Sequence, residues 1–420
     1  MYSNIKYCQT DSFPDKGNLI VNIVSITNEA PVNGATVVVM DDNQNNTYGE
    51  YTTDDSGQTE VITLGAPEKE LSLTINANIP YAKYSLMISA NGFESVLING
   101  VEILSDVTAI QNIRLMPRNN NDTVESFVIP DHTLYGDYPP KIAESEIKDV
   151  NETSEIVLSK VVIPEYIVVH DGPPGDRSAK DYYVRYKDYI KNVASSEIYA
   201  TWPLAAIQAN VLAIMSFTLN RVYTEWYRNR GYNFTITSST AFDQKWINGR
   251  NYYNTISNVV DTIFVNYLSK PNIKQPLFTQ YCDGKNATCP NWMTQWGSKS
   301  LADQGLTAIE ILRRYYGSNV FINTATEVSG IPSSWPGYNL NNGASGQKVL
   351  QLQKQLNTIA NTYKRIPKIA ADGIYGNQTK NAVKVFQSIF GLSPNGITDF
   401  PTWYKISEIY VAVTKIAEFI

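Results

Sequence analysis

Histidine is scarce in this 420-residue sequence, which contains only His132 and His170, far apart in the chain. Histidine-rich metal sites and serine–histidine–aspartate triads both need this side chain. The sequence therefore disfavours both kinds of site and leaves catalysis to carboxylates. Positively charged residues are fewer than negatively charged ones: 34 Lys and Arg against 40 Asp and Glu give a net charge of -6. Nucleic-acid-binding proteins usually carry an excess of positive charge, so we expect no nucleic-acid partner. We also expect no metal and no cofactor.

Cysteine is scarce as well, since three cysteines cannot build a disulfide framework and only Cys282 and Cys289 lie close together. This pair predicts either a disulfide or two free thiols, because the neighbouring sequence does not offer the two further ligands that a zinc would need. The first residues lack the positively charged and then apolar segments of a secretion signal. No conventional signal peptide is therefore expected.

One stretch could pass for a membrane span. Residues 198–220 contain no charged side chain, but they include proline, glutamine and asparagine, which would be costly in lipid. A helix that is buried on all sides in a globular protein has the same composition. The sequence therefore predicts a buried helix here and no membrane span.

The length favours a multidomain protein, and the composition changes along the chain. Residues 1–117 alternate β-rich runs with the turn signals Asn33-Gly34, Ser56-Gly57 and Asn91-Gly92, which indicates an N-terminal all-β sandwich. The predicted strands are 18–26, 35–40, 61–64, 71–79, 84–90 and 110–116. Through PVNGATVVV, DDSGQ and ANGFESVLINGV this portion resembles the transthyretin-like modules of bacterial surface proteins, which implies an accessory role that is not catalytic.

Three further segments follow. Residues 118–160 contain 9 Asp and Glu against 4 Lys and Arg, which indicates an acidic linker. We expect proteolytic processing in this exposed segment. Residues 161–336 mix strand-like and helical patterns, including predicted helices at the uncharged run and at residues 301–316, and they predict a central mixed α+β domain. Residues 338–420 predict a small three-helix bundle, because apolar side chains recur on one face of each helix.

The C-terminal module carries the most specific motif. The stretches NNGASGQKVLQLQKQLN, DGIYGNQTKNAVKVFQ and GLSPNGIT match the peptidoglycan-binding domain found on many cell-wall hydrolases. We expect its Asp-Gly turns to offer backbone donors to muropeptides beside the aromatic faces of Tyr375 and Trp403. The alternative is that most of these positions only maintain the fold. The predicted binding residues are Gln353, Asp372, Gly373, Tyr375, Gly376, Thr379, Gln387 and Trp403.

Glu197 directly precedes the uncharged run, so its carboxyl is expected among apolar neighbours. Burial favours the protonated form of a carboxyl, and a carboxyl that is protonated near neutral pH can act as the general acid in glycosidic-bond cleavage. From position alone, the alternative is a carboxylate at a helix N-terminus that the helix dipole stabilises.

The sequence around Glu197 resembles the lytic transglycosylases of the stage II sporulation protein D type, over about residues 183–317. In that family a catalytic Glu precedes a helix, and Asp-Gln and Met-Ser-Gln-Trp-Gly motifs follow. Here Asp243-Gln244 and residues 293–297 take those places. The resemblance implies that Glu197 is catalytic. The candidates for contacting the glycan are Asp243, Gln244, Tyr281, Asp283, Gln295 and Trp296.

The sequence departs from that family at two places. Gln208, Asn210 and Met215 stand where the family helix usually carries Lys, Gln and Arg, so the charged contacts around the site are expected to differ. The segment QYCDGKNATCPNW replaces a Ser-Gly-Gly-His region and leaves no histidine there for a metal. Both departures weaken the assignment of substrate contacts more than that of Glu197.

The order of sandwich, linker, catalytic domain and peptidoglycan-binding domain resembles the SleC-type spore cortex-lytic enzymes of clostridia across the whole chain. The resemblance implies an inactive precursor in the dormant spore and a subtilisin-like germination protease that removes an N-terminal propeptide. It also implies cortex peptidoglycan, with its muramic-δ-lactam, as the substrate. We therefore expect a spore location and a cut within residues 118–160.

A lytic transglycosylase needs one catalytic carboxyl, whereas ordinary glycosidases need two. The C6 hydroxyl of the muramic acid attacks its own C1, and intramolecular attack of this kind is strongly favoured. Glu197 would donate a proton to the leaving oxygen and then accept one from that hydroxyl. Two alternatives stay open: a muramidase-type hydrolase with Asp243 or Asp283 as the second carboxylate, and a catalytically inactive wall-binding or coat protein.

Overall fold

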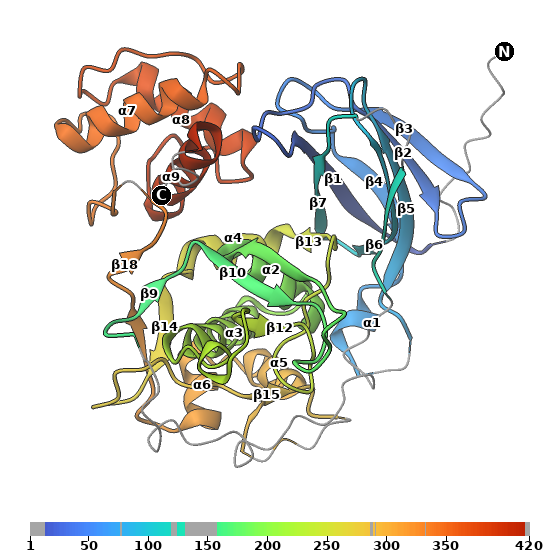
Figure 1. Cartoon of the computed structure of the whole chain (residues 1–420), viewed down its shortest axis with the longest axis vertical. Helices are drawn as coiled ribbons and strands as arrows, with labels where there is room; N and C mark the ends of the chain where they lie inside the picture. The colour runs from blue at the N-terminus through green and yellow to red at the C-terminus, as the bar shows by residue number, and fades with distance from the viewer. Residues whose placement is uncertain are drawn as a thin grey trace.

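The structure is a computed structural model that describes residues 13–75, 78–118, 124–130, 158–285, 289, 291–331 and 333–415. Figure 1 shows a β-rich N-terminal part in blue, a mixed middle part in green through yellow to light orange, and a helical C-terminal part in orange to red. Most of the predicted linker with its processing site lies outside the described residues, as does His132.

The N-terminal part consists of two β-sheets that pack against each other and is called the sandwich below. One sheet has the strand order β13-β7-β1-β4 and the other β3-β2-β5-β6-β8. Buried and partly exposed side chains alternate along β1, where Leu19, Val21 and Ile23 are fully buried, because successive side chains of a strand point to opposite faces. The strands are β1 (Asp15–Ser25), β2 (Thr36–Asp41), β3 (Thr47–Thr52), β4 (Ile62–Ala66), β5 (Tyr81–Ser89), β6 (Ser95–Leu104), β7 (Thr108–Leu115), β8 (Val124–Val128) and, from the middle part, β13 (Tyr252–Tyr253).

The predicted turns are confirmed, since Gly34, Gly57 and Gly92 all have positive φ angles. The strand predicted at 71–79 is wrong, because the chain forms the short helix α1 (Glu70–Leu73) there. Helix α1 makes tertiary contacts with the middle part, and such contacts override local β-propensity. The sequence analysis also missed β3, β6 and β8.

The middle part alternates short strands with helices around a central helix. Its elements besides β13 are β9 (Val162–Ile163), β10 (Tyr166–His170), β11 (Asp181–Arg185), α2 (Tyr186–Glu197), α3 (Leu204–Tyr223), the 3-10 helix η2 (Arg228–Arg230), β12 (Ile236–Thr237), α4 (Asn254–Ile263), β14 (Asn266–Ser269), β15 (Tyr281–Cys282), β16 (Met293–Thr294), α5 (Gln295–Asp303), α6 (Ala308–Tyr316), β17 (Phe321–Thr324) and β18 (Glu327–Val328). The single helix predicted at 301–316 is wrong. The helix is interrupted because Gly305 has a φ of 89° and Thr307 forms a capping box with Glu310 at the start of α6.

Helix α3 contacts α2, α4, α5, α6 and β14 and is buried along nearly its whole length, which confirms the predicted buried helix. Its polar side chains are tied into the fold: Asn210 donates to Ser298 Oγ, and Ser216 accepts from the Leu268 backbone. None of the helices in the described part of the chain is both long and apolar enough to span a bilayer.

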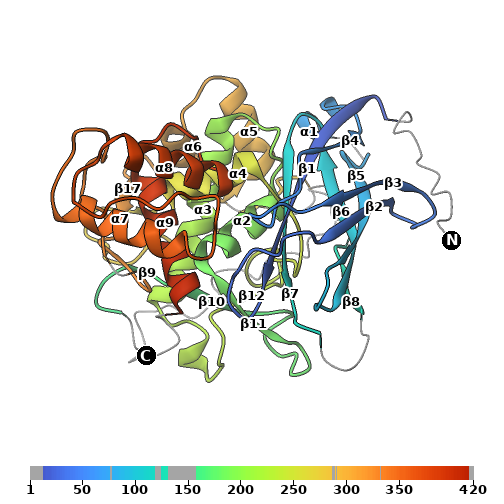
Figure 2. The ribbon, with the colours of Figure 1, turned by 90° about the horizontal axis from the view of Figure 1, so that it is seen from above.

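The C-terminal part is helical, with α7 (Gln347–Ile359), α8 (Asn377–Ile389) and α9 (Phe400–Thr414). The apolar face predicted for the first helix is confirmed, because Val349, Leu352, Leu356 and Ile359 are fully buried. Figure 2 shows this part and the sandwich on either side of α2 and α4.

Polar contacts join all three parts. The sandwich binds the C-terminal part through Arg365, which donates to Asp54 Oδ2 at 2.7 Å and to Ser56 Oγ at 3.1 Å. The middle part binds the C-terminal part through Glu408 of α9. This carboxylate pairs with Lys187, and it lies 3.1 Å from Lys405 Nζ and 3.9 Å from Arg185 Nη1. Residues of all three parts also line one cavity of about 390 Å³.

Burial alone would raise the pKa of Glu408, but the cations Lys187, Lys405 and Arg185 together hold that pKa well below its ordinary value. A carboxyl whose pKa is lowered by folding stabilises the folded state above its unfolded pKa, about 4.3 for Glu. This stabilisation is lost as the pH falls below that value.

We expect Glu408→Gln to lower the free energy of unfolding at pH 7 by about 2 kcal/mol, because it removes the carboxylate that pairs with the partly buried cations Lys187, Lys405 and Arg185. The difference from the unsubstituted chain should shrink as the pH falls below about 4.3, because the unfolded chain then binds a proton at Glu408 while the folded carboxylate, with its lowered pKa, does not. Urea unfolding followed by tryptophan fluorescence measures both effects. Glu327→Gln, which removes an exposed pair with Lys160, is the matched control and should change stability by less than about 1 kcal/mol. Equal losses in the two variants would contradict the assignment.

Candidate active site

Glu197 is the last residue of α2 and only 2% of it is exposed. Its Oε1 accepts a hydrogen bond from the Lys245 backbone N–H at 2.7 Å. The helix-N-terminus alternative is therefore wrong, because the carboxyl lies at the C-terminal end of α2, where the helix dipole does not favour negative charge.

Tyr281 of β15 lies beside this carboxyl and forms a hydrogen bond with it. Burial, followed by the charge of Glu197, raises the pKa of Tyr281 well above its ordinary value, so the phenol stays protonated across the neutral range. The Glu197 carboxyl thus lies between a peptide N–H and a phenolic hydroxyl.

Gln244 holds Tyr281 in place. Its Nε2 donates to Tyr281 Oη and to the Ile214 backbone oxygen, both at 3.1 Å. Its Oε1 accepts from Tyr189 Oη at 3.0 Å and from Thr218 Oγ1 at 2.8 Å. Both the nitrogen and the oxygen of the Gln244 side-chain amide are therefore hydrogen-bonded, and the residue is fully buried. Gln244, predicted to contact the glycan, positions Tyr281 in this structure.

Asp243 is also fully buried and committed to internal contacts. Its carboxylate accepts from Arg221 Nε at 2.9 Å, from Tyr227 Oη at 2.6 Å, and from the backbone and hydroxyl of Thr237 at 3.0 and 2.8 Å. The Arg221 guanidinium lies 4.6 Å from the ring centroid of Trp226. The sequence analysis missed Arg221 and Tyr227; an arginine just after an uncharged helical run was the available signal for a buried carboxylate partner.

The motif at residues 293–297 comprises β16 and the start of α5. Trp296 is 9% exposed, and its ring centroid lies 5.0 Å from that of Trp202 and 6.2 Å from that of Tyr199. Among the described residues, Gln295 Oε1 and Trp296 Nε1 have no hydrogen-bond partner although they are buried. Buried polar atoms normally find partners, so these two atoms are available to a ligand or water. Gly297 is required sterically, because a Cβ there would lie 2.1 Å from Thr294 Oγ1.

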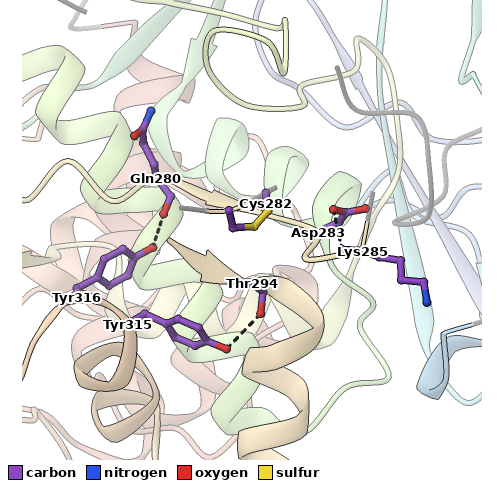
Figure 3. The surroundings of a disulfide bond; sticks show 8 residues. Gln280, Cys282, Asp283, Lys285, Thr294, Tyr315 and Tyr316 are labelled. Atoms are coloured by element: carbon purple, nitrogen blue, oxygen red, sulfur yellow. Dashed lines mark hydrogen bonds between the residues drawn. A yellow bond between two sulfur atoms is a disulfide. The ribbon is translucent and has the colours of Figure 1, made fainter. Parts of the chain in front are cut away.

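Cys282 and Cys289 form a disulfide, with Cα atoms 6.0 Å apart. Figure 3 shows its surroundings: Tyr316 donates to the Gln280 backbone oxygen at 2.8 Å, next to Tyr281, and Asp283 follows Cys282. Asp283 is buried, and its Oδ1 accepts from the Lys285 backbone at 3.1 Å. The disulfide therefore closes a loop that begins at the residue following Tyr281.

The sandwich contacts the aromatic cluster of Tyr199, Trp202 and Trp296 at Trp202. The Trp202 indole donates to the Ser72 backbone oxygen at 2.9 Å, and the Thr201 hydroxyl donates to Ser72 Oγ at 2.7 Å. Ser72 belongs to α1, which extends from the sandwich toward the middle part in Figure 1.

In the C-terminal part, two glutamines occupy equivalent places in an internal repeat. Gln353 Nε2 donates to the Ile374 backbone oxygen and to Asp372 and Thr379, while its Oε1 accepts from the Gly373 backbone. Gln387 makes the same set of bonds to Ile397, Asn395, Thr402 and Gly396. Both predicted binding glutamines thus fix the shape of a turn.

The other residues predicted to bind muropeptides lie near these turns. Tyr375 and Trp403 are buried, and Tyr375 Oη donates to the Gly396 backbone oxygen at 3.1 Å. Asp372 lies on the surface, whereas Thr379 is buried, and Gly376 caps the N-terminus of α8. The apolar side chain that this turn exposes is Ile374, which was not predicted as a binding residue.

The comparisons with known proteins identify the C-terminal module. Residues 345–406 match the family described as "Putative peptidoglycan binding domain". The chain therefore carries a C-terminal peptidoglycan-binding domain. Over 262 residues the chain is also 26% identical to the N-acetylmuramoyl-L-alanine amidase CwlL of Bacillus licheniformis, a match that covers 61% of this chain and 69% of that protein.

Two solved structures illustrate the structural matches. The Bacillus anthracis TIE protein matches with a TM-score of 0.18 and 19% identity, over 24% of this chain and 17% of that one. GBS52, a minor pilin of Streptococcus agalactiae, matches with a TM-score of 0.19 and 14% identity, over 28% of this chain and 49% of that one.

Because Asp243 is saturated by internal donors, we expect Asp243→Asn to act on stability. The substitution should lower the free energy of unfolding by about 3 kcal/mol, since it leaves the buried Arg221 charge without its partner. Thermal and urea unfolding measure this loss. Asp303→Asn, which breaks an exposed pair with Lys299, should cost less than about 1 kcal/mol. Unchanged stability of Asp243→Asn together with weakened glycan binding would instead support a direct role in binding.

Proposed function

We propose that this protein is a peptidoglycan-cleaving lytic transglycosylase, acting on spore cortex, with Glu197 as its catalytic acid and base. The observation that carries the proposal is the Glu197 carboxyl held between the Lys245 N–H and Tyr281. The peptidoglycan-binding domain and the similarity to a cell-wall amidase support action on peptidoglycan. The motifs that resemble the stage II sporulation protein D family support the type of cleavage and the sporulation setting.

In the proposed reaction, Glu197 protonates the oxygen that leaves C1 of the N-acetylmuramic acid unit, and the glycosidic bond to N-acetylglucosamine breaks. The C6 hydroxyl of the same sugar bonds to C1, and its proton passes to the Glu197 carboxylate. The carboxyl is restored, a 1,6-anhydro sugar forms and no water is consumed. Tyr281 would orient the carboxyl through its hydrogen bond, and Gln244 would orient Tyr281.

Mass spectrometry of fragments released from purified spore cortex tests this chemistry. We expect anhydro-muropeptides from a chain that begins near Val150, and a loss of at least about 1,000-fold in the rate with Glu197→Gln, because an amide cannot transfer the proton. The matched control is Glu310→Gln, whose carboxylate lies in the capping box of α6. Reducing-end sugars would point to a muramidase instead.

A second candidate activity is supported by the similarity to CwlL, which is an N-acetylmuramoyl-L-alanine amidase. An amidase would cut the bond between the sugar lactyl group and the first alanine, leaving glycan strands intact. The same mass spectra separate the two, because an amidase releases free peptides whose yield does not depend on Glu197.

We also propose that the protein is made as an inactive precursor. Glu197 is buried in the full chain, and Ser72 of the sandwich holds Trp202 beside Trp296. A subtilisin-like germination protease that cuts within residues 118–160 would allow the sandwich to leave.

The precursor proposal predicts that the chain starting near Val150 cleaves cortex at least tenfold faster than the full chain. The physical reason is access, because the contacts of Ser72 must break before a glycan reaches the aromatic cluster. Release of soluble muropeptides over time measures both rates. Equal rates for the two chains would overturn the precursor proposal and leave the cleavage chemistry untouched.

A further inference from the structure

The loop that follows the Glu197-binding residue Lys245 holds one acidic residue of the sandwich from several sides. Arg250 Nη2 donates to Glu102 Oε2 at 2.5 Å, and Tyr253 Oη donates to the same oxygen at 3.2 Å. Asn251 forms a pair of bonds with the Glu102 backbone: its Oδ1 accepts from the N–H and its Nδ2 donates to the carbonyl, both at 3.1 Å. We call Arg250, Asn251 and Tyr253 the carboxylate clamp.

The clamp recognises a specific chemical pattern. The arginine and the phenol bind the carboxylate. The asparagine side chain bonds to the backbone N–H and carbonyl of the same residue, as a neighbouring strand would. This set of donors and acceptors selects an extended peptide that carries an acidic side chain. All three clamp residues and Glu102 are buried.

Burying this pair is a poor way to hold two domains together, because desolvation of two charges roughly cancels their attraction. The sandwich already has apolar and strand contacts to the same loop: β13 pairs with β7, and Gly249 packs on Phe127. The charged pair therefore adds little net free energy to an attachment that these other contacts already make.

The clamp is also connected to the candidate catalytic carboxyl. Arg250 Nη1 donates to Ser196 Oγ at 3.1 Å, and Ser196 immediately precedes Glu197 in α2. The loop that carries the clamp begins at Lys245, whose backbone N–H binds the Glu197 carboxyl. A ligand in the clamp would thus lie next to the site where the glycan is proposed to be cleaved.

We propose that the carboxylate clamp is the subsite for the acidic peptide stem of peptidoglycan, and that Glu102 occupies it in the full chain as a substitute for that stem. The inference rests on the proposed function in taking peptidoglycan as the substrate. Departure of the sandwich would free the Arg250 guanidinium, the Asn251 amide and the β13 edge for an extended peptide. The substrate class is then glycan strands that still carry peptides with a free carboxylate.

The test uses the full chain with Glu197→Gln and with a specific protease site inserted within residues 131–157. After cutting, both fragments stay in solution, and size-exclusion chromatography measures how much sandwich is released. The probes are the tetrapeptide L-alanyl-γ-D-glutamyl-diaminopimelyl-D-alanine and the same peptide with its glutamate α-carboxylate amidated. We expect the acidic peptide to release the sandwich at a concentration at least tenfold lower than the amidated one.

Arg250→Gln should reduce that tenfold preference to less than twofold, and Tyr253→Phe, which removes one hydroxyl, should reduce it about threefold. The matched control is Arg365→Gln, which loosens the sandwich at its contact with Asp54 but should leave the acid-over-amide preference unchanged. Equal potency of the two peptides, or no release by either, would overturn the inference. The Glu197→Gln chain is used to measure peptide binding and not cleavage, so the result is independent of which peptidoglycan bond the active protein cuts.

Discussion

Three consecutive positions, Asp243, Gln244 and Lys245, connect the elements on which the candidate site depends. The Asp243 carboxylate binds Arg221 at the C-terminal end of α3, Gln244 joins α2 and α3 to β15, and the Lys245 N–H binds the Glu197 carboxyl. The bonds of Asp243 and Gln244 are buried and that of Lys245 is partly buried, so an unpaired donor or acceptor would be costly there. A shift of this segment would therefore disturb α2, α3 and Tyr281 together, so the position of the Glu197 carboxyl is coupled to the packing of the middle part.

The sandwich uses the loop that continues from this segment. From Arg250 to Tyr253 the chain leaves the Glu197 site, binds Glu102 and joins the sheet of the sandwich as β13. The same few residues thus contact both the sandwich and Ser196, which immediately precedes Glu197 in α2. Through these contacts, a shift of the loop on release of the sandwich would be transmitted to Ser196 and so to the neighbouring Glu197.

The sequence predicted features that depend on local periodicity and on backbone conformation. The buried face of α7, the buried helix α3 and the glycine turns at positions 34, 57 and 92 follow from side-chain spacing or from the need for positive φ. It did not predict features set by distant partners. The partners Glu102 and Arg250 are 148 positions apart, and α1 replaces an expected strand where Ser72 meets Trp202. The motif residues Asp243 and Gln244 were found in sequence, but only their hydrogen bonds reveal a positioning role.

The peptidoglycan-binding domain shows the same distinction between a motif and its chemistry. Gln353 and Gln387 each bind three acceptors and one backbone N–H, so their amides are occupied in shaping the turns at Gly373 and Gly396. These glutamines build the turns, so the atoms on the surface belong to other residues, and the exposed apolar side chain is Ile374. Recognition by this domain would therefore depend on the backbone and apolar surface of the turn that the glutamines hold. In the middle part, by contrast, the Arg250 guanidinium is occupied by Glu102 of the sandwich, and the proposed departure of the sandwich would make it available.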